Sequence, residues 1–93
     1  MPDEKPPFAR YLNERVVVDT RSRYVYLGRL TEVTHTELVL ADTDVHDLED
    51  GASSRDIYIL RARSDGVHEN RREVTVRLDM VLSVSRLDDV IAY

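Results

Sequence analysis

Residues 24–40 read Tyr-Val-Tyr-Leu-Gly-Arg-Leu-Thr-Glu-Val-Thr-His-Thr-Glu-Leu-Val-Leu, and this stretch decides the fold. Two apolar runs, 24–33 and 38–40, flank a polar turn at 34–36, which predicts two antiparallel strands. Gly28 interrupts the first strand. A glycine inside a strand marks a sharp bend or the close approach of another backbone. The stretch therefore predicts a small sheet that curls onto itself.

The length and composition predict one domain over residues 1–93, with residues 1–7 as a polar, proline-rich tail. The chain is 42% apolar, which is enough for a small core whose stability is marginal without oligomerisation. Cysteine is absent from the sequence, and this excludes disulfides and thiolate metal sites. No apolar run approaches the ~20 residues of a membrane span, so we expect a cytoplasmic protein without membrane contact.

The charge balance limits the kind of partner. Thirteen basic residues stand against eighteen acidic ones, for a net charge of −5. Broad, non-specific nucleic-acid binding needs a basic face, so this class is disfavoured. A small local site is still allowed, and its cations would be arginines, because Lys5 is the only lysine.

The rest of the chain predicts short elements around the central stretch. Residues 8–14 carry Phe8, Tyr11 and Leu12 at helical spacing, and 15–20 form a β-branched strand. Strands are also expected at 37–41, 73–77 and 81–87, with a break at 78–80. Residues 42–54 are acidic and predict a loop. Ser54 and Gly66 are typical of the two ends of a helix between them, although the alternating Ile57 and Ile59 would also suit a strand.

Two motifs in these strands resemble those of the Sm-like family. Residues 26–30, Tyr-Leu-Gly-Arg-Leu, and 37–40, Glu-Leu-Val-Leu, are similar to the halves of its first motif, with Glu37 in place of Asn. Residues 76–78 and 81–84 resemble the second, with Leu78 in place of Gly. Over residues 8–41 and 73–87 the chain resembles a divergent Sm-like (LSm) protein of the bacterial or phage type. The resemblance implies an all-β small barrel, Sm-like or SH3-like, of five strongly bent antiparallel strands, with a short N-terminal helix and a helical insert at 42–72.

The resemblance also implies assembly. Sm-like proteins form homo-oligomeric rings of about five to seven subunits, in which the fourth strand of one subunit pairs with the fifth strand of the next. The two strands here are apolar and carry little charge to protect an edge. The alternative is that they pair with each other within one chain. The expected interface residues are Val74, Val76, Val81, Leu82 and Val84.

A nucleic-acid site follows from the same resemblance. In members that bind uridine-rich single-stranded RNA, three side chains stack on, hold and back each uracil, and their counterparts here are His35, Glu37 and Arg77. Imidazole and guanidinium groups can stack on bases. A carboxylate only accepts hydrogen bonds and adds negative charge near phosphates. The alternative is that His35 is a turn residue and that Glu37 and Arg77 form a salt bridge.

Two further groups of residues were weighed. Asp42, Asp44 and His46 have side chains that bind divalent cations, but their spacing fits no known loop, and a solvated acidic loop is the simpler interpretation. We therefore expect no metal site and no cofactor. No catalytic residue is expected either, because Ser53 and Ser54 lie in no nucleophile elbow. The insert carries an apolar cluster that either packs over the barrel or serves a partner, and basic residues that could contact RNA. These residues are Ile57, Tyr58, Ile59, Leu60 and Ala62, and Arg61, Arg63, Arg71 and Arg72.

The sequence thus predicts a non-enzymatic Sm-like protein that forms a homo-oligomeric ring and binds RNA in a regulatory role. The alternative is an oligomeric scaffold or protein-interaction module without RNA binding. Glu37 and the net charge of −5 are the features that favour the alternative.

Overall fold

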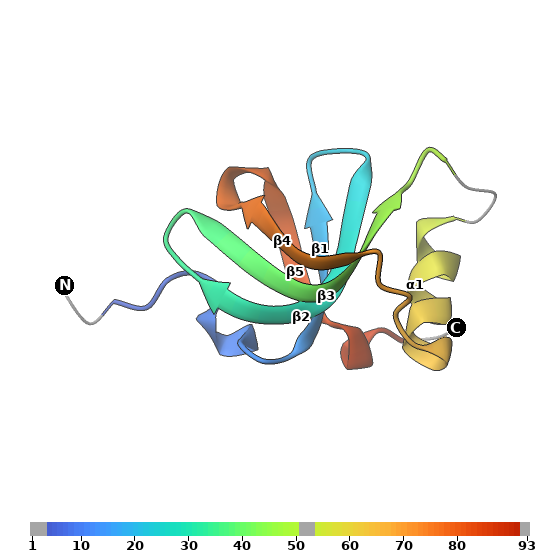
Figure 1. Cartoon of the computed structure of the whole chain (residues 1–93), viewed down its shortest axis with the longest axis horizontal. Coiled ribbons are helices and arrows are strands. Elements are labelled where there is room, and N and C mark those ends of the chain that lie inside the picture. The colour runs from blue at the N-terminus through green and yellow to red at the C-terminus, as the bar shows by residue number, and fades with distance from the viewer. Residues whose placement is uncertain (1–3, 51–53, 92–93) are drawn as a thin grey trace.

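The computed structural model describes residues 4–50 and 54–91, which form one antiparallel sheet with a helix against it (Figure 1). The strand order is β4-β3-β2-β1-β5. Because β4 and β5 lie at opposite edges, the sheet is not closed, and the alternative that these two strands pair with each other within one chain is wrong. The elements are η1 (Ala9–Tyr11), β1 (Arg15–Thr20), β2 (Tyr24–Val33), β3 (Glu37–Asp47), α1 (Arg55–Asp65), β4 (Arg71–Arg77), η2 (Leu78–Met80), β5 (Val81–Arg86) and η3 (Leu87–Asp89).

Gly28 lies where the backbones of β2 and β3 leave no room for a side chain. A Cβ atom on Gly28 would be 2.5 Å from Oγ1 of Thr43 and 3.0 Å from the carbonyl oxygen of Ala41. The β2–β3 register shifts at this point, and Asp42 has a positive φ of 49°. These are the signs of a bulge, which bends a strand. The predicted close approach at Gly28 is confirmed.

The main correction to the sequence analysis concerns β3. Residues 42–47, expected as the start of an acidic loop, continue the strand and pair with β2, where Tyr26 faces Val45 and Tyr24 faces Asp47. The ten residues of β2 need this longer partner to satisfy their backbone hydrogen bonds. The segment between β3 and β4 is therefore 48–70 and not 42–72, because β4 begins at Arg71, which pairs with Thr43.

Smaller corrections concern the two ends of the chain. The expected helix at 8–14 is the single 3₁₀ turn η1, from which Phe8 and Tyr11 reach the core while Leu12 is exposed. Too few residues are available here to nucleate an α-helix. The last strand ends at Arg86, because Leu87 opens η3.

The sheet has an apolar core on each face, and β1 contributes to both. Val16 and Val18 point to the inner, concave face, while Val17 points to the outer face. Full burial of such a side chain stabilises the fold by about 1.5–3 kcal/mol. The inner core consists of Val16, Val18, Leu30, Leu38, Leu40, Val76 and Val84, and the outer core of Val17, Val25, Leu27, Ile59, Ala62 and Leu87.

Helix α1 covers the outer face, and its ends are the predicted ones. The Ser54 hydroxyl accepts a hydrogen bond from the Ile57 amide at 3.3 Å, and Gly66 ends the helix with a φ of 95°. Ile59 and Ala62 are buried against the sheet, whereas Ile57 is 47% exposed. The apolar cluster of the insert is thus largely packing for the sheet. In the described part of the chain, no helix has the length and apolar character needed to cross a membrane.

Candidate nucleic-acid interface

The turn between β2 and β3 is held by Thr34. Its hydroxyl accepts hydrogen bonds from the amides of Thr36 at 3.2 Å and Glu37 at 3.1 Å, and its own amide donates to the Glu37 carbonyl at 2.9 Å. This side-chain turn satisfies the backbone locally. As a result, His35 lies exposed at the tip of the hairpin.

The connection between β4 and β5 lies directly beside this turn. Glu37 and Arg77 face each other in the β3–β4 register, and the Leu78 amide donates to the Thr36 carbonyl at 2.9 Å. Both connections lie at the same end of the molecule (Figure 1). The predicted residues His35, Glu37 and Arg77, which are distant in sequence, are therefore brought together.

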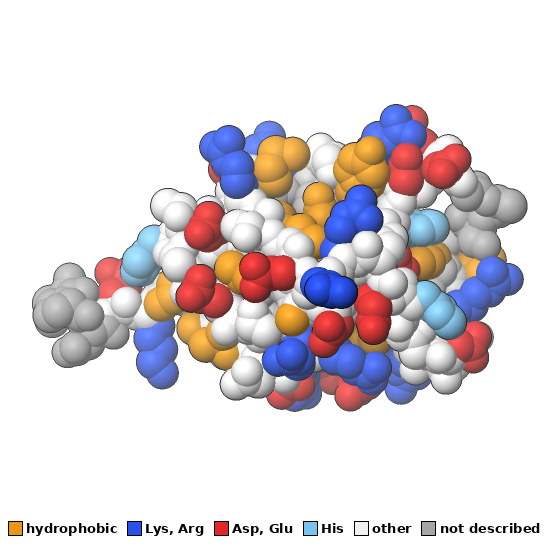
Figure 2. All heavy atoms as spheres, in the orientation of Figure 1, with side chains coloured by type: hydrophobic (Ala, Val, Ile, Leu, Met, Phe, Trp, Pro, Cys, Tyr) orange, Lys and Arg blue, Asp and Glu red, His pale blue; other side chains and the backbone are white. Residues whose placement is uncertain are grey.

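The charges at this end of the molecule leave the Arg77 guanidinium accessible to a ligand. Its side chain is 77% exposed, and its guanidinium pairs with Asp79, with 2.6 Å between Nη2 and Oδ2, and not with Glu37 as the alternative interpretation required. An ion pair this exposed contributes only about 0–1 kcal/mol, so a competing anion can displace Asp79. On the face in Figure 2, acidic and basic side chains are interspersed.

A hollow of about 200 Å³ lies between β2, β4 and the turns beside them. The hollow was not predicted from the sequence, because its lining comes from segments that are distant along the chain. The Arg21 amide donates to the Met80 carbonyl at 2.8 Å, which holds the β1–β2 turn against η2. The residues lining the hollow are Thr20, Ser22, Tyr24, Tyr26, Thr75, Val76, Arg77 and Met80.

The five predicted interface residues divide into two kinds. Val76 and Val84 are buried in the inner core, and Val74 and Val81 pack partly against it. Leu82 is different, because it is 65% exposed. Apart from Leu82, these side chains serve the fold of one chain, so an assembly through β4 and β5 would rest mainly on backbone hydrogen bonds at the two edges.

The comparisons with known proteins agree with this architecture. No protein-family model matches the sequence, and a search of curated proteins found no match either. Among solved structures, the Sm protein of Pyrococcus abyssii in complex with a uridine heptamer matches with a TM-score of 0.58 and 25% sequence identity, over 89% of this chain and 99% of that chain. This chain is Sm-like.

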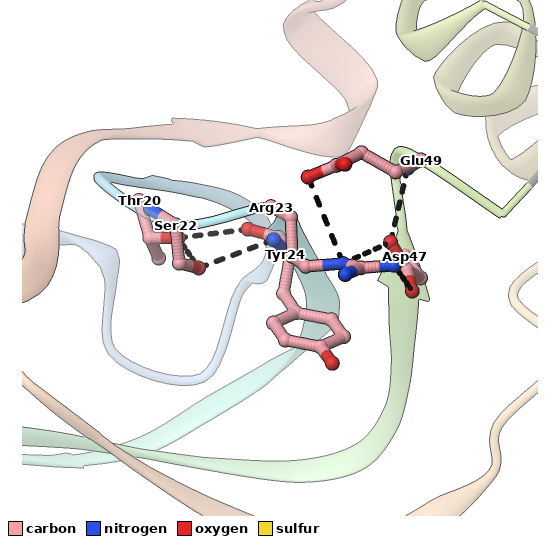
Figure 3. Close-up of polar contacts among 6 residues, drawn as sticks. All are labelled: Thr20, Ser22, Arg23, Tyr24, Asp47 and Glu49. Atoms are coloured by element: carbon pink, nitrogen blue, oxygen red, sulfur yellow. Dashed lines mark hydrogen bonds and ion pairs between the residues drawn. The ribbon is translucent and has the colours of Figure 1, made fainter.

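A second polar cluster lies on the Sm-like sheet away from His35, where the β1–β2 turn meets the end of β3 (Figure 3). Arg23 binds both carboxylate oxygens of Asp47, at 2.8 and 2.7 Å, and lies 3.8 Å from Glu49. The hydrogen bond from Arg23 lowers the pKa of Asp47, and the same contact raises the pKa of Arg23. Thr20 and Ser22 bond to each other and to the backbone of the turn. These groups satisfy one another and fix the turn.

The three residues weighed as metal ligands do not converge in the Sm-like fold. Asp42 lies in the bulge, 3.8 Å from Arg29. Asp44 accepts hydrogen bonds from the Tyr58 hydroxyl and, at 3.0 Å, from Asn70, and the His46 ring stacks on Tyr58 with centroids 3.7 Å apart. Within residues 4–50 and 54–91, no group of three or more His, Asp or Glu side chains is placed to hold a metal ion.

These contacts make Tyr58 the link between α1 and β3. Partial burial, with the hydrogen bond to Asp44, raises the pKa of the Tyr58 phenol. Asn70 adds to the link, because its side chain bonds both the amide and the carbonyl of Val45, at 3.0 and 3.2 Å. This network was not predicted, because Asp44 was assigned to a loop.

Proposed function

We propose that this Sm-like chain binds uridine-rich single-stranded RNA at the end of the sheet where residues 34–37 meet residues 77–79. One observation carries the proposal: the Leu78 amide bonds the Thr36 carbonyl, which sets Arg77 and Glu37 next to the turn that carries the exposed His35. The matching Sm protein was solved in complex with a uridine heptamer, and this supports the choice of ligand.

Each side chain has a role that its chemistry allows. The His35 imidazole stacks on a uracil ring, and the Arg77 guanidinium, once released from Asp79, stacks on the base or bonds a phosphate. Glu37 accepts a hydrogen bond from the N–H of uracil. Its charge opposes the phosphates, so binding is expected to be modest and to weaken steeply with salt.

Assembly is the second part of the proposal. The chain forms a homo-oligomeric ring in which β4 of one copy extends the sheet of the next copy at β5. The support is that the two strands lie at opposite edges of the same open sheet. Such an interface is heterologous, and heterologous pairing gives a ring when the rotation between successive copies closes. In this proposal the ring is cytoplasmic, regulatory and non-enzymatic.

A second candidate function is an oligomeric scaffold without RNA binding. The carboxylate of Glu37 in the centre of the site favours it, together with the net charge of −5. The two candidates share the ring and differ only in the ligand.

Light scattering of the purified chain, with and without a uridine-rich oligonucleotide, tests the proposal. A mass of several subunits that increases with the oligonucleotide is expected, and Arg77→Ala should shift this increase to about tenfold higher oligonucleotide concentration. Arg63→Ala, an exposed arginine in the last turn of α1, is the control and should bind as the parent does. A ring that binds no oligonucleotide in low salt would favour the scaffold, and a monomer would contradict the ring.

A further inference from the structure

We propose that α1 forms part of the contact between copies, and that two carboxylates on the rim of its groove receive Arg71 of the neighbouring copy. The inference rests on the ring of the proposed function and adds residues to it. The residues involved are Asp56 and Asp89 on one copy, with Arg71 on the next, and Leu82 with the hollow beside β4 at the other end of the same contact.

The β5 edge borders a groove under α1. This groove has a volume of about 320 Å³, and its floor includes Val17 and Ile59. Arg55, which also lines the groove, pairs with Asp19, with 2.8 Å between Nε and Oδ1, and Ser83 of β5 donates to the other oxygen of Asp19 at 3.0 Å. The groove is thus fixed rigidly to the β5 edge.

The rim of this groove carries two exposed carboxylates, those of Asp56 and Asp89, beside the guanidinium of Arg55. Asp56, in the first turn of α1, keeps 79% of its side chain exposed and pairs with Arg55 at 3.1 Å. Asp89 lines the same groove and pairs with Arg86 at 3.0 Å. Ser85 is the β5 residue that opens onto the groove, so a strand added at this edge would run past both carboxylates.

The opposite edge of the sheet has complementary features. Strand β4 begins with Arg71 and Arg72 and ends beside the hollow lined by Tyr26, Val76 and Met80. Val74 and Val76 point to the inner core, so alternation directs Arg71 to the outer face, on which α1 lies. Both arginines are exposed.

One orientation satisfies both ends of the contact. Every strand pair in this sheet is antiparallel, and a copy added in the same manner places the start of its β4 at the end of β5. Arg71 of that copy then meets the rim of Asp56 and Asp89. At the other end, the exposed Leu82, near the start of β5, meets the apolar wall of the hollow.

The charges also select this pairing over a symmetric one. Two antiparallel β4 edges would bring Arg71 of each copy near Arg77 of the other, which repels. Two β5 edges would leave both hollows empty. A second copy in head-to-tail orientation is therefore the occupant that fits. Because Arg77 lines the hollow, the contact also borders the proposed RNA site.

Charge exchange tests the inference on the full chain. Arg71→Glu and Asp56→Arg should each weaken the association between copies about tenfold or more, measured as mass against concentration by light scattering. The double variant, which carries both substitutions, should recover most of the parental association. Arg63→Glu changes the same charge on the exposed side of α1 and should leave the mass unchanged. Circular dichroism confirms that each variant is folded.

The outcomes separate this inference from the ring itself. If the parent is a ring and both single variants keep its mass, the Arg71–Asp56 contact is wrong while the ring stands. If both single variants dissociate and the double variant does not recover, the two residues do not meet, and the inference fails. A parent that is monomeric at all concentrations overturns the ring and this inference together.

Discussion

Two groups of polar residues in this Sm-like chain differ in how their hydrogen bonds are satisfied. Near α1, Asp44 accepts hydrogen bonds from Tyr58 and Asn70, and His46 stacks on Tyr58. At the other end, His35 is exposed and Arg77 has only a surface ion pair with Asp79. Residues of similar chemistry therefore stabilise the fold near α1 and remain accessible to a ligand at the other end. The difference lies in the residues that surround them in the folded chain.

The largest expected effect comes from Tyr58→Ala. The substitution removes the stack on His46, the hydrogen bond to Asp44 and part of the outer core. We expect the free energy of unfolding to fall by about 2–4 kcal/mol, measured by urea denaturation. Binding of a uridine-rich oligonucleotide to the fraction that stays folded should be unchanged. Tyr58→Phe, which keeps the ring, should cost about 1 kcal/mol.

Arg77→Ala should weaken RNA binding and leave the stability of the fold almost unchanged. We expect RNA affinity to fall about tenfold, because one stacking or phosphate contact is lost. The free energy of unfolding should change by less than about 0.5 kcal/mol, because the side chain is exposed. Fluorescence anisotropy with a labelled oligonucleotide and urea denaturation measure the two quantities. A large loss of stability with unchanged affinity would reverse the assignment of the two regions.

The contribution of Tyr58 to the stability of the fold should depend on pH. The folded state raises the pKa of Tyr58, so the neutral phenol stabilises the fold fully below about pH 10, the value of an unfolded tyrosine. As the pH rises further, the unfolded chain loses this proton first, and stability declines. Thermal unfolding between about pH 9 and 11 should therefore fall less steeply in Tyr58→Phe than in the parent. Equal slopes would mean that this phenol is not held in its neutral form.

The smallest expected change is that of Glu37→Gln. Removing one negative charge beside the RNA, and adding an amide donor, should raise affinity about threefold at low salt. The measurement is the same anisotropy titration at several salt concentrations. A decrease in affinity would show that the carboxylate itself accepts a hydrogen bond that the amide cannot replace.

Local signals in the sequence predicted much of the fold. The bounds of β1 and β2 followed from β-branched and alternating residues, Gly28 predicted the close approach, and Ser54 and Gly66 predicted the ends of α1. The length of β3 was missed. Its acidic residues resemble a loop, and only the partners on β2, α1 and residue 70 satisfy them in a strand.

The candidate site was predictable only in part. Two turns that are forty residues apart were connected by their resemblance to family motifs, and the structure places them side by side through Leu78 and Thr36. The hollow beside Met80 and the groove under α1 could not be predicted, because each depends on how distant segments pack. The exposure of Leu82 was likewise not predicted, because strand alternation groups this residue with Val84, which is buried.

Hydrogen exchange with and without a uridine heptamer tests the central claim most directly. The account predicts slower exchange in residues 34–37 and 77–79 when the heptamer is present, with α1 and Asn70 unchanged. Protection over α1 or at Asn70, with none in the two turns, would contradict the proposed RNA site and place the ligand on the other region of the molecule.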